Sequence, residues 1–308
     1  MALHIITADE RLATKAKVNI ALFGPSGIGK TYQARTLPPG ETLFIDLEAG
    51  TLALDGSAED GSDAWRGDVI NVRAEASKAG VHPWEFARAI ICLLGGADPA
   101  APPGDPYAAD MFAMYEQHIA PRAMFDKYSI VYIDSITVAS RLAFSWSQRQ
   151  PDAFSEKTGK PDTRGAYGLL GREMVKWLTQ AQHIPGKSIV VVGILDAVKD
   201  DFGRLLYEPQ IEGSKAGREL PGIFDQVITY GLFDLSSGNP VLDLQKGQQR
   251  GFVCHQNNGF GVPAKDRSGR LQAIEAPNLG DIIKKIQSGP RSDTANYAAP
   301  SIPQTPGQ

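Results

Sequence analysis

The chain alternates short apolar runs with longer amphipathic stretches. Short apolar runs that are rich in β-branched side chains are typical of strands buried on both faces of a parallel sheet. The pattern therefore predicts a buried sheet that needs cover on both sides. The candidate strands occupy residues 18–23, 42–46, 130–134 and 188–195.

Helical stretches separate these strands. Strands that alternate with helices favour an α/β fold of the doubly wound or a related type, with a mostly parallel sheet flanked by helices. Residues 95–106 are rich in proline and glycine, so they are expected to form a surface loop between the second and third strands. The predicted helices lie at about 31–37, 84–94, 107–125, 136–149 and 165–183.

The pattern changes after about residue 226. Short β-like pieces at 227–235, 241–244, 251–255 and 270–274, separated by turn residues, predict antiparallel strands at the sheet edge. Residues 288–308 carry few large apolar groups, which is typical of a disordered tail. The sequence thus predicts one domain over 1–287 and a tail over 288–308, which is either a solubilising end or a peptide arm for a partner.

The first predicted strand runs directly into a glycine-rich loop. Residues 24–31 match the phosphate-loop pattern G-x-x-x-x-G-K-[ST] at every fixed position. Glycines let such a loop wrap a phosphate with its N–H groups pointing inward, while the lysine neutralises the β- and γ-phosphates and the threonine holds Mg²⁺. The expected nucleotide-binding residues are Gly24, Pro25, Ser26, Gly27, Ile28, Gly29, Lys30 and Thr31.

Carboxylates follow two other predicted strands. Asp134 ends the third strand, and because the carboxyl ends of parallel strands share one edge of the sheet, it is expected to orient Mg²⁺ beside Thr31. Glu48 follows the second strand, where a carboxylate could accept a proton from water attacking the γ-phosphate. Asp46 shares its facing along the strand and is an alternative base or a support for Glu48. The other reading is that both simply end a strand in solvent.

Composition narrows the setting. A length of 308 residues allows one large α/β domain or two small ones, and an apolar content of 42% is enough for a core. The net charge of −4 excludes a global basic field, so any nucleic-acid surface must be local. Cys92 and Cys254 form neither a disulfide framework nor a zinc site, the histidines lack metal-ligand spacing, and no signal peptide or membrane span is visible. These features predict a cytoplasmic protein without membrane contact.

The three motifs, in this order, resemble the core of RecA-type ATPases. RecA and RadA relatives carry the phosphate loop, then a strand that leads into the catalytic glutamate, then a strand that ends in Asp-Ser; here these read GPSGIGKT, FIDLEAG and VYIDSIT. The likeness includes 164–168, 213–221 and 264–269 and covers roughly 15–285; it is similar in particular to phage-encoded RecA-like ATPases, the phage nucleotide-binding proteins. The resemblance implies a RecA-like P-loop NTPase core that uses ATP and Mg²⁺ in single-strand annealing or recombination, in the cytoplasm of the bacterial host.

Lys265 and Arg267 lie in a segment, KDRSG, that resembles the Lys-Asn-Arg-x-Gly element of RadA-like ATPases. In that family a basic residue of this element reaches the nucleotide of the adjacent subunit, which implies a homo-oligomer, either a ring or a filament. A cation there could stabilise charge on the γ-phosphate across an interface. The alternative is a solvated β-turn, since Asp-Arg-Ser-Gly is favourable turn chemistry.

One position departs from the RecA pattern. RecA relatives place a polar sensor, often Gln or His, after the fourth core strand, where this chain has Asp196. A carboxylate there would repel a triphosphate unless a cation or Lys199 intervened, or Asp196 could cap the next turn. Coupling of the γ-phosphate to DNA binding is therefore a weaker expectation than nucleotide binding.

A local basic region follows the third predicted strand. Residues 141–176 carry seven basic and four acidic side chains, a net charge of +3, and 148–165 is predicted to be a mobile loop. Basic groups track phosphates and aromatic rings stack on bases, so the region is expected to contact single-stranded DNA, as the loop at this place does in RecA relatives. The alternative is a solvated face with core aromatics. The residues concerned are Arg141, Arg149, Phe154, Lys157, Lys160, Arg164, Tyr167, Arg172, Lys176 and Trp177, of which Trp177 is assigned to the core, and a second segment holds Lys199, Arg204, Lys215 and Arg218.

Three functions are compatible with these features. The first is an ATPase that assembles on single-stranded DNA in phage-type recombination or annealing, with a single-strand-binding protein as a further partner. The second is a helicase-like or loader ATPase of replication, and the third is a nucleotide-gated binding module with little turnover. The order of the motifs and the compact length favour the first.

Overall fold

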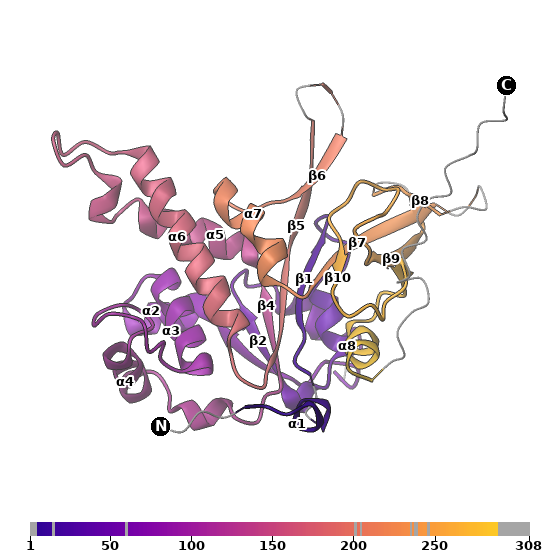
Figure 1. Cartoon of the computed structure of the whole chain (residues 1–308), viewed down its shortest axis with the longest axis horizontal. Coiled ribbons are helices and arrows are strands. Elements are labelled where there is room, and N and C mark those ends of the chain that lie inside the picture. The colour runs from indigo at the N-terminus through magenta and orange to yellow at the C-terminus, as the bar shows by residue number, and fades with distance from the viewer. Residues whose placement is uncertain are drawn as a thin grey trace.

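A central sheet with helices on both faces forms the body of the protein (Figure 1). The computed structural model describes residues 5–13, 16–58, 61–199, 202–203, 205–234, 236, 240–244 and 247–288, and for 11–13 and 214–216 it describes the backbone alone. This arrangement confirms the α/β fold with a mostly parallel sheet.

The parallel part of the sheet has the strand order β3-β2-β4-β5-β1-β7. Strands β1 and β4, which lead into the phosphate loop and Asp134, are therefore separated by β5. Three of the predicted strands agree closely with the structure, and the fourth continues four residues further, to Lys199. The bounds are β1 Asn19–Gly24, β2 Thr42–Asp46, β3 Asp68–Asn71, β4 Ile130–Asp134, β5 Ser188–Lys199 and β7 Gln226–Asp234.

The C-terminal strands correct the prediction in one respect. β7 was expected at an antiparallel edge, but it pairs parallel to β1 through Ile20–Gln226 to Phe23–Thr229, because the chain crosses the sheet through α7 before β7 begins. Antiparallel pairing starts beyond it. β8 (Val241–Leu242), β9 (Gln249–Val253) and β10 (Lys265–Asp266) pair with β7, β11 (Ile274–Glu275) pairs with β9, and β6 (Leu205–Pro209) pairs with the far end of β5.

Side chains alternate between two buried cores along each central strand. In β1, Ala21 and Phe23 face one core, while Ile20 and Leu22 face the other. The first core lies under α2 (Val72–Ala79), α3 (Pro83–Gly95), α4 (Ala109–His118), α5 (Ile136–Ser147), α6 (Thr163–Gln182) and α7 (Ser214–Ile223). The second lies under the short 3₁₀ helices η1 (Thr31–Thr36) and η3 (Thr51–Leu54) and under α8 (Leu279–Ser288).

Several elements differ from the predicted helices. The stretch after the phosphate loop is a six-residue 3₁₀ helix, and the predicted helix 107–125 divides into α4 and η4 (Arg122–Phe125) around Pro121. The short elements β3, α2 and α8 were not predicted, and neither were α1 (Ala8–Ala13), η2 (Pro39–Glu41) and η5 (Pro151–Ala153). Ser288 ends α8, so it does not belong to the tail; residues 289–308 lie outside the described part of the chain. Within that described part, no helix is both long and apolar enough to cross a membrane.

Candidate functional site

The phosphate loop leaves the carboxyl end of β1 and turns tightly. Gly27 and Gly29 have φ angles of 79° and 107°, in the left-handed region that favours glycine. A Cβ atom on Gly24 would lie 2.7 Å from the carbonyl oxygen of Tyr230 on β7. Ile28 is buried in the second core and so anchors the loop to the body of the protein. The glycine positions of the motif are thus required by backbone conformation and by close packing.

Lys30 points back across the mouth of this loop. Its Nζ donates hydrogen bonds of 2.9 Å to the carbonyl oxygens of Gly24 and of Pro25. Burial lowers the pKa of Lys30, while the negative charges of Asp134 and Glu48 oppose that shift. Because the helix that follows the loop is a single short 3₁₀ segment, phosphate binding here would rest on loop N–H groups and on Lys30 rather than on a long helix dipole.

Thr31, the residue after Lys30, contacts Asp134. The Thr31 hydroxyl donates a 2.6 Å hydrogen bond to Oδ2 of Asp134, at the end of β4. Tyr132, two residues earlier on β4, donates its own 2.6 Å hydrogen bond to the carbonyl oxygen of Lys30. Two contacts from one strand therefore hold the end of the phosphate loop against β4.

The Asp134 carboxyl is buried, with 4% of its surface exposed. Burial raises its pKa to about 7, with further upward contributions from Glu48 and Asp46, against the lowering effects of the Thr31 hydrogen bond and the Lys30 charge. Carboxylates and a hydroxyl are hard oxygen donors of the kind that Mg²⁺ prefers, and an added cation would relieve the negative charge gathered here. Among the described residues, no cluster of three or more His, Cys, Asp or Glu side chains forms a metal site. Mg²⁺ held by Thr31 and Asp134 would therefore complete its coordination with phosphate oxygens and water.

Asp46 and Glu48 have different surroundings. Asp46 is buried, and its Oδ1 accepts hydrogen bonds from the N–H groups of Glu48, Ala49 and Gly50 at 3.0, 2.7 and 3.3 Å. Its Oδ2 accepts a 3.2 Å hydrogen bond from Asn71. Glu48 is exposed, and its Oε1 accepts a hydrogen bond from the hydroxyl of Ser135. The strand ends at Asp46, so the expected common facing does not extend to Glu48; Asp46 organises the loop that carries Glu48.

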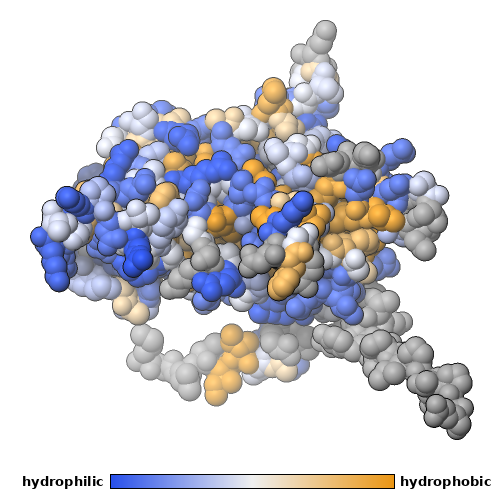
Figure 2. Space-filling model, turned by 90° about the horizontal axis from the view of Figure 1, so that it is seen from above, coloured by the Kyte–Doolittle hydropathy of each residue, from blue (hydrophilic) through white to orange (hydrophobic). Residues whose placement is uncertain are grey.

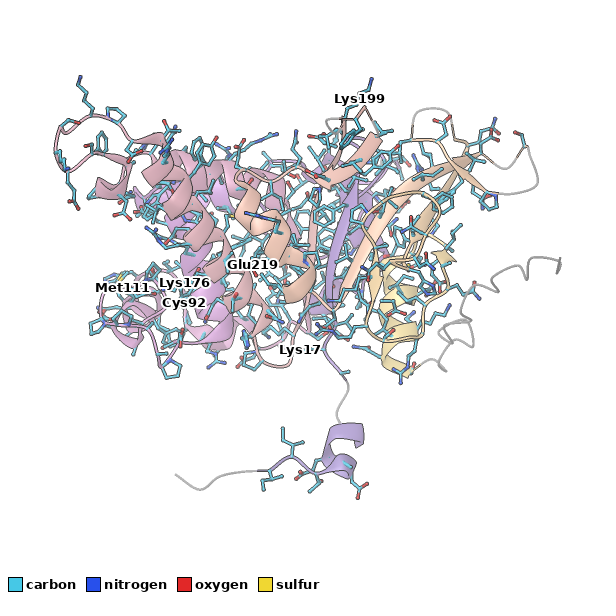
Figure 3. All side chains as sticks on the ribbon, turned by 45° about the horizontal axis from the view of Figure 1, so that its top comes forward. Lys17, Cys92, Met111, Lys176, Lys199 and Glu219 are labelled. Atoms are coloured by element: carbon cyan, nitrogen blue, oxygen red, sulfur yellow. The ribbon has the colours of Figure 1, made fainter. Side chains whose placement is uncertain are left out.

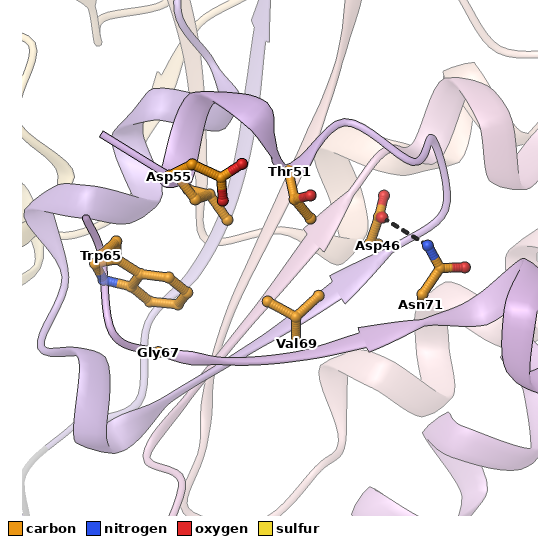
Figure 4. Close-up of a pocket in the computed structure, with 8 residues that line it drawn as sticks. Asp46, Thr51, Asp55, Trp65, Gly67, Val69 and Asn71 are labelled. Carbon is orange, nitrogen blue, oxygen red and sulfur yellow. Dashed lines mark hydrogen bonds between the residues drawn. The ribbon is translucent and has the colours of Figure 1, made fainter. Parts of the chain in front are cut away.

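A cavity of about 380 Å³ lies beside Asp46, between η3 and the edge strand β3 (Figure 4). The Asp46–Asn71 hydrogen bond closes one end of this cavity, and the ring of Trp65 lies at the other. Trp65 in turn packs edge-on against Phe44 of β2. The remaining lining residues are Thr51, Leu54, Asp55, Gly67 and Val69.

The structure does not bring Lys265 and Arg267 to the phosphate loop of the same chain. β10 pairs with the first residues of β7, at the end of the sheet opposite the loop. Lys265 donates hydrogen bonds to the carbonyl oxygens of Pro221 and Phe224, and Arg267 forms a 2.8 Å ion pair with Asp225. Any contact of these cations with a nucleotide would have to be made with another copy of the chain.

Residues 148–164, from the end of α5 to the start of α6, project from the body of the molecule and are called the projecting region below (Figure 1). The predicted mobile loop has defined structure: η5 is followed by a bridge between Phe154 and Pro161, and the Ser155 N–H bonds to the Lys160 carbonyl at 2.8 Å. Gly165 lets α6 pack against η5, because a Cβ there would lie 2.0 Å from the carbonyl oxygen of Asp152. Arg149, Lys157, Lys160 and Arg164 are exposed.

Other members of the basic region have partners within the chain. Arg172 pairs with Asp152, Lys176 with Asp105, and Arg141 donates to Gln210 at 3.0 Å. Phe154 and Tyr167 are 41% and 42% exposed, although Tyr167 also stacks on Phe144. Trp177 is buried in the first core, as predicted.

The second candidate DNA segment is a two-stranded ribbon formed by β5 and β6. The ribbon rises from the carboxyl end of the sheet, with Lys199 near its far end (Figure 3), while Lys17 lies toward the opposite end of the molecule.

Asp196 lies inside β5, opposite Glu208, so it neither ends a strand nor caps a turn. The side chains of Arg204 and Lys215 are outside the description, and Arg218 is exposed. Figure 2 looks down on the carboxyl end of the sheet and shows hydrophobic surface on one side of the molecule. The ribbon itself exposes four apolar side chains, Val198, Phe202, Leu205 and Leu206.

Three residues of the site were missed by sequence reasoning. Ser135 and Asn71 both precede a helix, so an N-cap rule finds them as helix caps, at α5 and α2. Their second contacts, to Glu48 and Asp46, depend on strands that are neighbours in space. Tyr132 carries no local signal beyond its place in an apolar strand.

The site geometry agrees with the comparison of the chain with protein families. A family profile described as an AAA domain matches residues 16–268. This range includes the phosphate loop, Glu48, Asp134 and the first four residues of the KDRSG segment, 265–268. No curated protein matches the chain.

Proposed function

The chain belongs to a family of AAA domains, which are P-loop ATPases, and we propose that it binds ATP with Mg²⁺ at residues 24–31 and hydrolyses it. The observation that carries the proposal is the 2.6 Å contact between Thr31 and Asp134 beside Lys30. It joins a phosphate-binding loop to a buried carboxylate, which is the arrangement that a Mg²⁺–triphosphate complex requires.

Each residue of the site has a separate role in the proposed hydrolysis. Lys30, with Gly24 to Gly29, would bind the β- and γ-phosphates, and Thr31 and Asp134 would hold the metal ion. When bound, Mg²⁺ would neutralise charge on the phosphate oxygens. Glu48 lies on the adjacent β2–η3 loop and accepts the proton of the attacking water, while Asp46 fixes that loop through three backbone hydrogen bonds.

We assign the ATPase to RecA-like action on single-stranded DNA in phage-type recombination or annealing, in the cytoplasm of the bacterial host. The order of the motifs supports this assignment. So does the projecting region, in which four cations and the ring of Phe154 are exposed. Phosphate contacts from the cations and stacking on the ring would bind a strand without sequence preference. A single-strand-binding protein is the natural further partner.

Assembly in a head-to-tail homo-oligomer completes the proposed site. Lys265 and Arg267 lie at the end of β7 opposite the phosphate loop, so a neighbour stacked along the strand direction would bring them toward the nucleotide. If they act across the interface, Lys30→Ala subunits mixed with Arg267→Ala subunits regain activity, because one chain supplies the pocket and the other the cation. Co-assembled mixtures that are no more active than their components would refute the trans role.

The decisive experiment measures the rate of ATP hydrolysis against added single-stranded DNA, with light scattering for assembly. Stimulation by the DNA together with growth in size supports the recombination function. Unwinding of a tailed duplex would favour a helicase-like or loader ATPase instead. The carboxylate pair Asp196–Glu208, in place of a Gln or His sensor, favours the other candidate, a nucleotide-gated binding module; tight ATP binding with negligible turnover, with or without DNA, would support it.

A further inference from the structure

Ser135 makes two hydrogen bonds that join separate parts of the site. Its side chain is buried, with 1% of its surface exposed. The hydroxyl donates its proton to Oε1 of Glu48 and accepts the N–H of Val138 at 3.3 Å, as the N-cap of α5. One hydroxyl thus connects the β2–η3 loop to the first turn of a helix.

The helix that carries Ser135 is held firmly. The Thr137 hydroxyl accepts the N–H of Ile194 on β5 at 3.0 Å, and the Ser140 hydroxyl accepts the N–H of Glu212 at 3.0 Å. Ile136 and Ala139 are fully buried in the first core. The Ser135 hydroxyl therefore has a fixed position relative to the sheet.

Glu48 lacks such support from packing. Its side chain is exposed, and it follows the end of β2 on a loop in which Ala49 has a φ angle of 62°. The backbone of that loop is held by Asp46, but backbone anchoring leaves the rotatable bonds of the Glu48 side chain free to choose among rotamers. A donor on a rigid element selects one of them.

We propose that Ser135 is a positioning residue that orients Glu48 for proton transfer, by holding Oε1 and leaving Oε2 directed at the attacking water. The inference rests on the proposed role of Glu48 as the base. Preorganisation of this kind acts on the chemical step, because the base must lie within hydrogen-bond reach of the proton that it removes.

The test compares three single variants in steady-state ATP hydrolysis. Ser135→Ala removes the donor and should lower kcat about tenfold, the order expected for a hydrogen bond to a charged group, with KM for ATP within about twofold. Ser135→Thr keeps the hydroxyl and should recover most of kcat. Ser147→Ala is the matched control, a fully buried serine at the other end of α5, and it should behave like the wild type. Loss of kcat in Ser147→Ala equal to that in Ser135→Ala would overturn the proposal.

A double-mutant cycle separates this proposal from the one on which it rests. In a Glu48→Gln background, Ser135→Ala should cause no further loss of kcat, since the base through which it acts is gone. A further tenfold loss in that background would overturn the positioning role. Normal turnover of Glu48→Gln alone would instead remove Glu48 as the base. If Glu48→Gln is slow but Ser135→Ala keeps its kcat, only the role of Ser135 fails.

A readout without nucleotide completes the design. Urea unfolding of Ser135→Ala, Glu48→Ala and the double variant should show non-additive losses of stability, because the two residues share one hydrogen bond. Additive losses would mean that the contact does not form in solution, and the proposal would fall.

Discussion

The hydroxyl of Thr31 lies 2.6 Å from the carboxylate of Asp134, although the two residues are 103 positions apart in the sequence. Because β5 separates β1 from β4 in the sheet, the phosphate loop that leaves β1 reaches past the end of β5 to make this contact. It joins the end of the phosphate loop to the buried acid that is proposed to hold Mg²⁺. Because this acid is buried, its ionisation changes the free energy of unfolding.

Asp134 should make the stability of the metal-free protein depend on pH. Its pKa is about 7 in the folded protein against 3.8 for the ordinary group, so the folded state retains a proton that the unfolded state has lost. The resulting stabilisation is fully present below about pH 4 and is lost as the pH rises toward 7, by up to about 4 kcal/mol. Urea unfolding in EDTA between pH 4.5 and 8 measures this loss. Asp134→Asn should flatten the profile, and an unchanged slope in that variant would contradict the assignment.

Lys30→Ala should abolish most ATP affinity and leave the fold intact. The side chain crosses the mouth of the loop and takes no part in either core. Wild-type protein should gain about 2.7 kcal/mol of stability from Mg-ATP at a hundredfold excess over Kd, and the variant should gain little. Thermal melting with and without Mg-ATP checks this. An equal shift in both proteins would show that Lys30 does not bind the phosphates.

Glu48→Gln should bind ATP normally and hydrolyse it at least about tenfold more slowly, a rise in the barrier of about 1.4 kcal/mol. The amide keeps the shape of the side chain and can still accept the Ser135 hydrogen bond, but it cannot accept a proton from water. Single-turnover hydrolysis with radiolabelled ATP measures the step directly. Near-normal turnover would shift attention to Asp46.

Gly24→Ala should destabilise the protein even without nucleotide. The added methyl group would lie 2.7 Å from the Tyr230 carbonyl oxygen, and because this atom belongs to the backbone of β7, the strand must move. We expect a loss of about 1–3 kcal/mol in urea unfolding. Gly40→Ala is the control, since its added methyl group meets nothing within 4 Å. Equal stability of the two variants would contradict the close packing of the loop against β7.

Replacement of Lys157, Lys160 and Arg164 by alanine should weaken binding to single-stranded DNA and leave ATP affinity unchanged. All three are exposed on the projecting region, so their removal should flatten the slope of log K against log salt by about two, at roughly 0.7 per contact. Fluorescence anisotropy over a range of salt concentrations measures the slope. A triple alanine variant of Lys78, Lys127 and Lys284, which are exposed elsewhere on the protein, removes the same charge and should keep the wild-type slope. Identical slopes for wild type and both variants would mean that the projecting region is a solvated surface.

Local chemistry explains what could be predicted from the sequence. The phosphate loop, its flanking strand and the strands that end at Asp46 and Asp134 follow from apolar runs and turn residues that are neighbours in the chain. The same logic located α3, α5 and α6, whose apolar positions recur with helical spacing. It failed at β3 and α2, which are short and only partly buried.

The fold class, the phosphate loop and the carboxylates that end the strands are predictable from the sequence, because they depend on residues close together in the chain. The difference between the two carboxylates depends on tertiary contacts: Asp46 is buried and accepts hydrogen bonds from three N–H groups, and Glu48 accepts a hydrogen bond from Ser135. The parallel pairing of β7 with β1, and the ion pair of Arg267 with Asp225 far from the loop of its own chain, depend on the tertiary structure as well. Strand order brings together residues that are distant in sequence, and no local pattern encodes which strands become neighbours.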